Sequence, residues 1–505
     1  MPSRIKTASI LGLEAQMIEV EADISAGLPN FFIVGLPDAA IQEAKERIRS
    51  AVKNSQLPFP RTRVTVNLAP AHVRKIGSGF DLPIALAILA ADGQLRLEQT
   101  STLFIGELAL DGTLRPIQGM ISVALLAKEL GIQELVVPRE NAEEAALIQG
   151  LQISYAHSLN EVQRALLGEA RLPEMPHTAP TPSTQDDTNR IDFSSIRGQE
   201  QARRALEIAA AGGHNLLMQG PPGSGKTMLA RAFNSILPAM TEQEMLEATR
   251  IHSVAGILPS QCVISARPFR SPHHTSSMTS LVGGGTIPRP GEVSLSHHGI
   301  LFLDELPEFS RATLECLRQP LEDGYIHISR AQSCVRYPAR FSLLAAMNPC
   351  PCGYRSDKER TCTCSQLMYE HYRQRISGPL LDRIDLYLDV PRVETDALTQ
   401  LPQGETSAVI RERVQRARDL QLKRFEKVGI TTNAQASSEQ VTQHFHLTSG
   451  AEQVLRQAIQ RFRLSARSYF RLLKVSQTIA DLAGETELET CHVAEALQYR
   501  SFSTI

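Results

Sequence analysis

The sequence predicts an α/β protein in three parts: an N-terminal α/β domain, a second α/β domain built on parallel strands, and a C-terminal helical domain. Three observations support this prediction. The stretch 171–190 is rich in proline and lacks hydrophobic periodicity, so it is expected to be a linker. Short apolar runs alternate with helical patterns on both sides of it. From about Ser407 onward, the runs typical of strands nearly disappear.

Length and composition set broad limits on the protein. A chain of 505 residues exceeds the size at which one hydrophobic core keeps growing and fits about three domains. Apolar residues at 42% and charged residues at 21% are typical of globular proteins. The formal net charge of -2 provides no global attraction to nucleic acid, so DNA contacts would need local patches. Without an export signal or an apolar spanning segment, we expect a cytoplasmic protein with reduced cysteines and no membrane partner.

The first domain is expected to span 1–170. Strand-like runs at 63–67 and Glu134–Pro138 alternate there with helical patterns at Ala39–Asn54 and Asp81–Ala91. This alternation predicts a compact α/β domain.

The next part, 191–400, is expected to contain a parallel sheet, and 401–505 a helical domain. Apolar runs between helical segments are typical of buried parallel strands joined by crossover helices. These runs are Leu216–Gln219, Ile300–Leu303 and 341–346. Long helical patterns at 408–425 and 451–462 follow in the last part.

A glycine-rich loop after the first of these runs matches the P-loop pattern, with a strand before it and a helix from Met228 after it. Its glycines let backbone N–H groups turn toward phosphates at a helix N-terminus, where the dipole also favours anions. We expect Lys226 to meet the β- and γ-phosphates of ATP and Thr227 to hold Mg²⁺. The expected nucleotide-binding residues are Gly220, Pro221, Pro222, Gly223, Ser224, Gly225, Lys226, Thr227 and Met228.

Two carboxylates come directly after the second apolar run. Ligands of open α/β sheets bind at the carboxyl ends of the strands, so we expect Asp304 to bind Mg²⁺ through water. Glu305 is expected to orient and polarise the attacking water. Asn348 follows the third run and is expected to sense the γ-phosphate. Together these side chains predict an ATP hydrolase.

Two arginines are candidates for the positive charge that phosphoryl transfer often receives from a neighbouring subunit. Arg383 lies in the segment 380–385, and Arg467 lies at the start of a helical pattern. By pattern alone, each is more often a solvated surface arginine. The pattern therefore leaves both roles open.

Four cysteines form two C-x-C pairs around a polar spacer: Cys350, Cys352, Cys362 and Cys364. Four thiolates suit tetrahedral Zn²⁺, and a structural zinc would hold a loop that is too polar to fold alone. The spacing is tighter than in common zinc sites, so four free thiols are the alternative. We expect zinc.

Further motifs lie at 267–274, 282–285, 299–309, 346–349 and 375–383, and in the first domain at 35–37, 67–70 and 80–84. With the P-loop, this set resembles the ComM/YifB family of magnesium-chelatase-like AAA+ proteins over nearly the whole chain. The resemblance implies an AAA+ ATPase core, a helical lid and a ring, expected to be a homohexamer. It also implies that Arg383 is an arginine finger acting in trans and that Arg467 is the sensor arginine of the lid.

The same resemblance implies a function on DNA. The family promotes branch migration during integration of DNA in natural transformation, as a helicase in homologous recombination. The alternative is a magnesium-chelatase-type ATPase that remodels a protein partner. The extra N-terminal domain, and the lack of an integrin-like metal-binding domain in this sequence, argue against that alternative.

The first domain further resembles the Lon protease domain, an α/β fold like domain 2 of ribosomal protein S5. Lon uses a Ser-Lys dyad, and the matching positions here are Gly77 and Ile121. Neither residue can perform or activate nucleophilic attack. The resemblance therefore implies a scaffold without proteolytic activity.

Two alternating runs about a polar tip predict a β-hairpin at 325–337. In related ring helicases such a hairpin points into the pore, which implies phosphate contacts from Arg330, Gln332 and Arg336. Without the family, a surface hairpin with ordinary charges is the simpler interpretation. A second pore loop is expected around 283–285, flanked by Arg267, Arg270, His273, His274 and Arg289.

Overall fold

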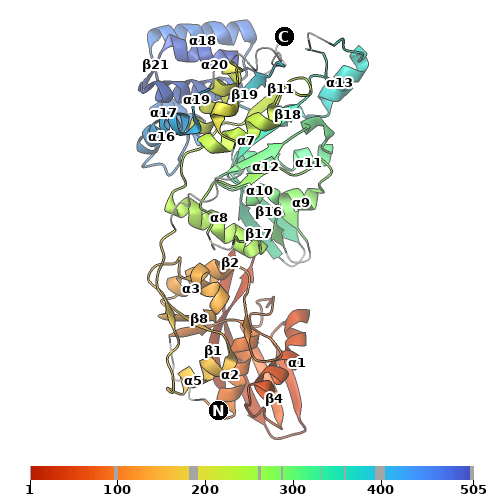
Figure 1. The fold of residues 1–505 in the computed structure, drawn as a ribbon, viewed down its shortest axis with the longest axis vertical. Helices are drawn as coiled ribbons and strands as arrows, with labels where there is room; N and C mark the ends of the chain where they lie inside the picture. The colour runs from red at the N-terminus through yellow and green to blue at the C-terminus, as the bar shows by residue number, and fades with distance from the viewer. Residues whose placement is uncertain are drawn as a thin grey trace.

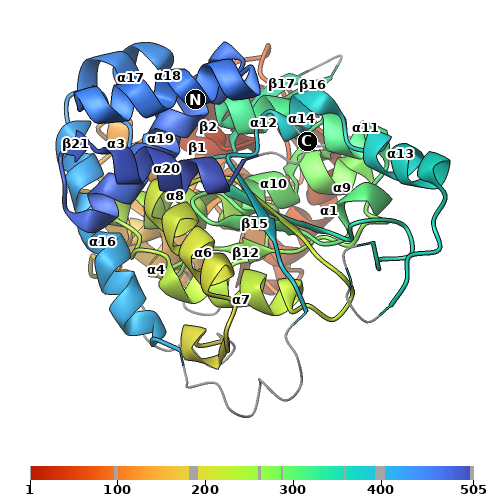
Figure 2. The ribbon, with the colours of Figure 1, turned by 90° about the horizontal axis from the view of Figure 1, so that it is seen from above.

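A computed structural model of the chain describes residues 2–95, 101–180, 191–259, 263–285, 288–330, 333–355, 357, 360–392 and 404–500. The N-terminal α/β part lies at one end of the longest axis of the molecule (Figure 1). The parallel sheet and the C-terminal helices lie side by side toward the other end (Figure 1 and Figure 2).

The N-terminal part is built on a mixed sheet of eight described strands in the order β10-β9-β8-β5-β1-β2-β4-β3. The long strands β1 and β2 pair antiparallel, and β1 pairs parallel with β5. The bounds are β1 (Ser3–Leu11), β2 (Glu14–Ser25), β3 (Asn30–Val34), β4 (Arg63–Ala69), β5 (Thr102–Phe104), β8 (Glu134–Pro138), β9 (Gln152–Ala156) and β10 (Glu174–Met175). Between β5 and β8 in the sequence, β6 (Glu107–Leu108) and β7 (Leu114–Arg115) pair antiparallel as a separate small ribbon.

Both faces of this sheet are covered by helices. Successive residues of a strand point to opposite faces, and Ile5 and Ala8 of β1 accordingly belong to different apolar clusters. Ile5 packs with α1 (Ala39–Asn54) and α2 (Asp81–Ala91), which are the two helices expected from the sequence. Ala8 packs with helices on the other face, α3 (Met120–Glu129) and α4 (Ala142–Ala145). The short helix α5 (Leu159–Leu166) follows β9.

The stretch 171–180, expected to be the first half of a linker, runs along the edge of this sheet. Its strand β10 pairs antiparallel with β9, and the N–H of Thr178 donates to the carbonyl of Ala146 at 3.2 Å. Proline is tolerated on an edge strand, so a proline-rich composition does not prevent this pairing. The rest of the expected linker, 181–190, lies outside the described residues.

The middle part contains an all-parallel sheet in the order β12-β15-β18-β11-β19. Its strands are β11 (Leu216–Gln219), β12 (Phe269–Arg270), β15 (Ile300–Leu303), β18 (Ser342–Met347) and β19 (Leu386–Asp389). The parallel pairing expected for three of them, β11, β15 and β18, is confirmed. All four residues of β15 are buried, as a parallel strand covered on both faces requires.

Helices and two ribbons surround this sheet. The predicted hairpin is present as β16 (Tyr325–Arg330) paired antiparallel with β17 (Ser333–Pro338), and a second ribbon joins β13 (Gly283–Gly284) to β14 (Arg289–Pro290). The helices are α6 (Glu200–Gly212), α7 (Lys226–Ile236), α8 (Glu242–Ala255), α9 (Met278–Val282), α10 (Glu292–Leu295), α11 (Arg311–Glu315), α12 (Arg318–Asp323), α13 (Gln366–Gln374) and α14 (Gly378–Leu381).

The C-terminal part is mainly helical and packs against the parallel sheet (Figure 2). Leu216 of β11 and Val475 of α19 belong to one apolar cluster. Its elements are α16 (Ser407–Arg424), α17 (Ser438–His444), α18 (Ser449–Phe462), α19 (Ala466–Ala483), α20 (Thr490–Gln498), β20 (His446–Leu447) and β21 (Glu487–Leu488). In the described part of the chain, we find no helix with both the length and the apolar character for crossing a membrane.

Helix α8 and the hairpin join the middle part to the N-terminal part. Arg250 of α8 donates from Nε to the carbonyl of Leu13 at 3.1 Å, and Ser253 hydrogen-bonds to the carboxylate of Glu144. Burial raises the pKa of Glu144 above its usual value. Leu13 also shares an apolar cluster with Val335 of β17. Val335 pairs with Ile328, two pairs from the tip side of the hairpin, so the outer half of the hairpin packs against the first domain.

Candidate functional site

The glycine-rich loop lies between β11 and α7, at the carboxyl edge of the parallel sheet. A Cβ on Gly220 would lie 2.2 Å from the carbonyl oxygen of Val390, so this close approach of backbone requires glycine. Gly225 precedes α7 with φ +87°, a conformation that also favours glycine. These two glycines fix where the loop leaves the strand and where it enters the helix.

Lys226 is nearly buried, and its ammonium group is folded back onto the loop. Nζ donates to the carbonyl oxygens of Gly220 at 2.7 Å and Pro221 at 2.9 Å, and to Oδ1 of Asn348 at 3.4 Å. Burial lowers the pKa of Lys226, although the charges of Asp304 and Glu305 oppose this shift. A phosphate would give this desolvated ammonium a better partner than carbonyl oxygens do.

Asp304 and Glu305 follow β15, directly across from the start of α7. The hydroxyl of Thr227 donates to Oδ2 of Asp304 at 2.8 Å, and the N–H of Glu305 donates to Oδ1 at 2.9 Å. Glu305 has φ +52°, which is uncommon for a residue other than glycine and is frequent at functional sites. The structure therefore brings the two motifs together as the sequence predicted.

Asn348 follows β18, the strand between β11 and β15. Parallel strands end at the same edge of a sheet, so this position lies between the P-loop and the two carboxylates. The hydrogen bond from Lys226 shows that the amide reaches the loop. The expected location of a γ-phosphate sensor agrees with this geometry.

These residues fit a nucleoside triphosphate with Mg²⁺. The Thr227 hydroxyl and the Asp304 carboxylate are close enough to share one ion, and oxygen is the ligand that Mg²⁺ prefers. The first turn of α7 has N–H groups without intrahelical acceptors. A Cβ at Gly223 or Gly225 would meet no atom within 4 Å, so the space over the loop is open.

The two candidate arginines lie at the opposite edge of the same sheet. In the parallel pair β11 and β19, Leu216 lies opposite Leu386. The P-loop follows β11, whereas Arg383 precedes β19, so about 13 Å of strand separates the two edges. Arg467 pairs with Glu322 at 3.2 Å, and Arg383 pairs with the same carboxylate. Arg383 thus lies at the edge of the sheet remote from the P-loop of its own chain.

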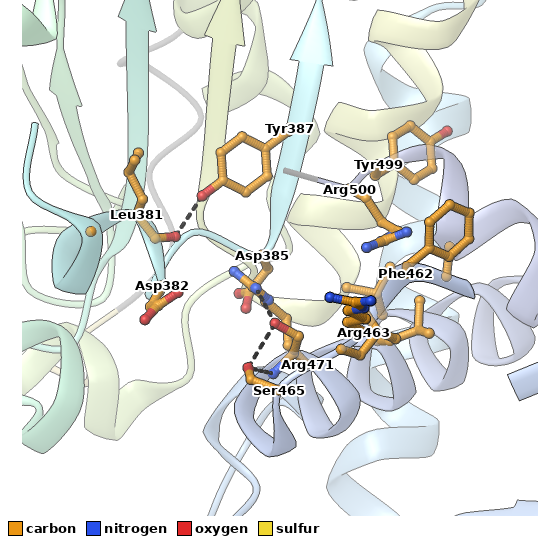
Figure 3. A pocket seen from close by; sticks show the side chains of 16 residues that line it. Leu381, Asp382, Asp385, Tyr387, Phe462, Arg463, Ser465, Arg471, Tyr499 and Arg500 are labelled. Carbon is orange, nitrogen blue, oxygen red and sulfur yellow. Dashed lines mark hydrogen bonds between the residues drawn. The ribbon is translucent and has the colours of Figure 1, made fainter. Parts of the chain in front are cut away.

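The segment that carries Arg383 is tied to the start of β11. The side-chain amide of Asn215 donates to the carbonyl of Arg383 at 2.9 Å, and its N–H donates to Asp385 at 3.1 Å. Burial raises the pKa of Asp385, but the hydrogen bond from His214 and the charge of Arg471 more than offset it and lower that pKa. Figure 3 shows Arg471 and Asp385 lining an adjoining pocket of about 320 Å³. The edge opposite the P-loop is thus well ordered by side-chain contacts.

The four clustered cysteines come together in space. Sγ of Cys350 lies 3.4 Å from Cys352 and 3.6 Å from Cys362, and all four sulfur atoms lie within 4.8 Å of one another. Tetrahedral zinc with Zn–S bonds of about 2.3 Å places the sulfurs about 3.8 Å apart. A backbone hydrogen bond from Tyr354 lowers the pKa of Cys352 to about 6. The donor set and its spacing fit Zn²⁺.

This cysteine cluster adjoins the P-loop. Gly353 follows Cys352 with φ +86°, and a Cβ there would lie 2.6 Å from Cδ of Pro222. Cys350 is separated from Asn348 by a single residue. The loop that carries the cysteines therefore supports both the P-loop and the strand end with Asn348.

Comparison with known proteins places the chain in a family. Models described as magnesium chelatase subunit ChlI match residues 20–141 and 192–398, and the model of its C-terminal part matches 404–500. Competence protein ComM of Haemophilus influenzae is 44% identical over 494 residues, which covers 97% of this chain and 96% of that protein. YifB of Escherichia coli is 43% identical over 508 residues, covering 100% and 98%. The chain belongs to the ComM/YifB family.

The family is magnesium-chelatase-like. A 67 kDa magnesium-chelatase subunit of Heliobacterium mobile is 25% identical over 196 residues, 33% of this chain and 29% of that protein. Membership in the ComM/YifB family implies an AAA+ ATPase whose ligands are ATP and Mg²⁺. The P-loop, Thr227 and Asp304 lie where this chemistry needs them.

In this ComM/YifB protein, the hairpin has one buried and one exposed face. Ile328 and Val335 are buried, whereas His327 and Arg336 form an exposed cross-strand pair. The guanidinium of Arg336 stacks over the ring of Tyr325 at 3.9 Å. Arg330 ends β16, and no side-chain geometry is described for it. Gln332 lies outside the described residues.

Two arginines that flank the expected second pore loop are paired with carboxylates inside the domain. Arg270 pairs with Glu292 at 2.6 Å, and Arg267 pairs with Glu244 at 3.0 Å. Arginines committed to internal carboxylates are poor candidates for phosphate contacts. Sequence patterns identify the two arginines but not the carboxylates that pair with them, Glu244 of α8 and Glu292 of α10.

His274 is a site residue that the sequence analysis missed. Its Nδ1 lies 3.3 Å from the Glu305 carboxylate. The residue follows β12, which pairs parallel with β15, so their carboxyl ends lie side by side. Recognition of 269–270 as a strand would have placed His274 at the same edge as Glu305.

Glu247, His297 and His298 also form a group with metal-ligand spacing, but its hydrogen bonds oppose metal binding. The N–H of Arg340 donates to Nδ1 of His297 at 3.0 Å, so the proton of the neutral ring lies on Nε2. That nitrogen is 3.2 Å from Glu247 and donates to it. His297 therefore has no lone pair for a metal, and the group ties α8 to the segment before β15.

This buried histidine predicts a pH dependence of stability. Burial lowers the pKa of His297 from 6.5 to about 4, so between these values the unfolded chain binds more protons than the folded chain. The group therefore lowers stability as pH falls through this window, by at most about 1.4 kcal/mol per pH unit. His297→Asn keeps an acceptor for Arg340 without that proton uptake.

We expect the Tm of His297→Asn to fall less between pH 7 and pH 5 than the Tm of the wild type. Differential scanning calorimetry at several pH values measures both. Parallel pH profiles of the two proteins would contradict the buried neutral histidine.

Proposed function

We propose that this protein is an ATP-dependent DNA motor that works as a homohexameric ring. In this proposal it is a helicase that promotes branch migration during integration of DNA in natural transformation and homologous recombination. The observation that carries the proposal is the placement of site residues at two opposite edges of one sheet. The P-loop with Asp304 and Glu305 occupies one edge, and Arg383 with Arg467 occupies the other. Each subunit then supplies half of a site to each of two neighbours.

The proposed roles follow from the chemistry of phosphoryl transfer. The P-loop and Lys226 bind the phosphates, and Thr227 with Asp304 holds Mg²⁺, which neutralises developing charge when bound. Glu305 orients and polarises the attacking water, and Asn348 senses the γ-phosphate. Arg383 of one subunit stabilises the transition state at the site of the next.

The roles proposed for the other parts rest on the resemblance to the family. In this proposal the N-terminal part is a Lon-like domain without proteolytic activity, and the C-terminal helices are the lid that carries Arg467. The hairpin lines the pore and contacts DNA phosphates through Arg330, Gln332 and Arg336, without sequence specificity. The protein acts in the cytoplasm. Similarity to a competence protein supports a role in transformation.

A second candidate is a chelatase-type ATPase that remodels a protein partner. Its support is the magnesium-chelatase description of the matching family models and the similarity to a magnesium-chelatase subunit. The two functions differ in one respect that can be measured, because only the motor requires stimulation of ATP hydrolysis by DNA.

We expect the wild type to hydrolyse ATP faster with forked or four-way DNA and to move the branch point. Lys226→Ala removes the phosphate-binding ammonium and should abolish both activities. Glu305→Gln should bind ATP but hydrolyse it at least about 100-fold more slowly, because the water loses its polarising group. Steady-state ATPase and gel-based branch-migration assays measure these effects, with the exposed Glu412→Gln on α16 as a control. ATP hydrolysis without any response to DNA would exclude the motor and leave the second candidate.

Mixed rings test whether Arg383 acts in trans. Arg383→Ala and Lys226→Ala should each be nearly inactive alone. When they are mixed, some interfaces combine an intact P-loop with an intact Arg383, so ATPase activity should return. A mixture as inactive as its components would show that both residues serve one subunit.

The cysteine cluster predicts bound zinc and a link to nucleotide affinity. We expect about one Zn²⁺ per chain by inductively coupled plasma mass spectrometry and its loss in Cys362→Ser/Cys364→Ser. Because Gly353 packs on Pro222, the metal-free variant should bind a fluorescent ATP analogue more weakly. Cys491→Ser, an exposed cysteine outside the cluster, is the control. Protein that is free of zinc as purified and binds the analogue normally would contradict the prediction.

A further inference from the structure

One carboxylate, that of Glu322 near the end of α12, holds both candidate arginines. Nη2 of Arg467 donates to its Oε1 at 3.2 Å, and Nη2 of Arg383 donates to its Oε2. The two arginines come from different parts of the chain, the segment before β19 and the start of α19. A single anion therefore brings them together in the absence of a neighbouring subunit.

The pairing leaves Arg383 incompletely satisfied. Its side chain is 11% exposed, and Nη1 donates to the carbonyl of Pro379 at 2.6 Å. Nε is buried and has no hydrogen-bond partner among the described residues. A guanidinium has five N–H donors, and a buried donor without an acceptor is costly. A phosphate group, with several acceptor oxygens, would satisfy Arg383 better than Glu322 does.

The three side chains line a cavity of about 800 Å³. Arg340 and Lys474 line it as well, and the lining holds more cationic side chains than carboxylates, although Asp382 and Asp385 are among the latter. Its volume lies in the range of pockets that take small-molecule ligands. Glu322 itself is 52% exposed, so it can leave the arginines for solvent at modest cost.

Glu322 is also connected to the hairpin. It is followed by Asp323, where α12 ends, then by Gly324 and by Tyr325, the first residue of β16. Gly324 has φ +72°. Its carbonyl accepts a hydrogen bond from the N–H of Ala339, which follows β17, at 2.8 Å. A shift of the end of α12 therefore reaches both strands of the hairpin at their root.

We infer that Glu322 competes with the nucleotide phosphate of the neighbouring subunit for binding to Arg383 and Arg467. It holds Arg383 and Arg467 when no nucleotide faces them, and it gives them up when a phosphate arrives. The release of Glu322 frees the end of α12 and passes through Gly324 to the hairpin. Nucleotide state at one interface is thereby coupled to the hairpin of the subunit that donates the arginines. This inference rests on the proposed action of Arg383 in trans.

The test compares Glu322→Gln, Asp323→Asn and Arg383→Ala in the full-length protein, with and without four-way DNA. Asp323 carries the same charge on the same helix, and among the described residues no ion pair joins it to either arginine. Because the competing carboxylate is removed, the Glu322→Gln variant should have a KM for ATP that is lower by roughly three- to tenfold, with kcat undiminished. Its ATPase should also respond less to DNA, because the link to the hairpin is weakened. Asp323→Asn should behave as the wild type, and Arg383→Ala should lose kcat.

The outcomes separate this inference from the proposed function. If Arg383→Ala loses kcat but Glu322→Gln matches Asp323→Asn, the competitor is excluded and the trans arginine stands. If Glu322→Gln loses kcat as Arg383→Ala does, Glu322 positions the arginines for catalysis, and competition is again excluded. If Arg383→Ala keeps full activity, the proposed site between subunits is wrong, and the inference fails with it. In the double variant Glu322→Gln/Arg383→Ala, the KM effect of the first change should shrink, because its main partner is absent.

Discussion

In a parallel sheet every strand ends at the same edge, and the candidate site depends on this constraint. The order β15-β18-β11 brings Asp304, Asn348 and the P-loop side by side at the carboxyl edge. The same geometry forces the segment that enters β19 to the other edge, with Arg383. One sheet therefore separates Arg383 from the P-loop of its own chain by the length of a strand. Under the proposed function, a second subunit would complete the site, and hydrolysis would then depend on ring assembly.

Neighbouring elements contact the residues at both edges of the sheet. At the carboxyl edge, Gly353 of the cysteine loop packs on Pro222, and His274 contacts Glu305. At the other edge, Glu322 links the arginines to α12 and thus to the root of the hairpin, while Val335 in the outer half of the hairpin packs with Leu13 of the first domain. The two ion pairs each have a carboxylate that is more than half exposed, and such partly exposed pairs contribute about 1 kcal/mol or less. Small energies of this kind suit a cycle in which each contact is made and broken at every turnover.

The sequence was informative where a pattern is local. The P-loop, the apolar run before Asp304, the helices at Ala39–Asn54 and Asp81–Ala91, and the hairpin follow from spacing of neighbouring residues, and the structure contains them as predicted. Contacts between distant segments were not predictable in this way. The pairing of Glu322 with Arg383 and Arg467, the contact of His274 with Glu305, and the internal ion pair of Arg270 all depend on how separate elements pack. Charge and position on the chain do not specify a partner.

Under the proposed function, Arg383 and Arg467 of one subunit complete the nucleotide site of the next. An electron cryomicroscopy structure of the full-length Glu305→Gln protein with ATP and four-way DNA tests it most directly. We expect a closed ring in which both arginines have left Glu322 and contact the triphosphate on the neighbouring P-loop. A ring in which they still pair with Glu322 while ATP fills every site, or a monomer with bound ATP, would contradict it.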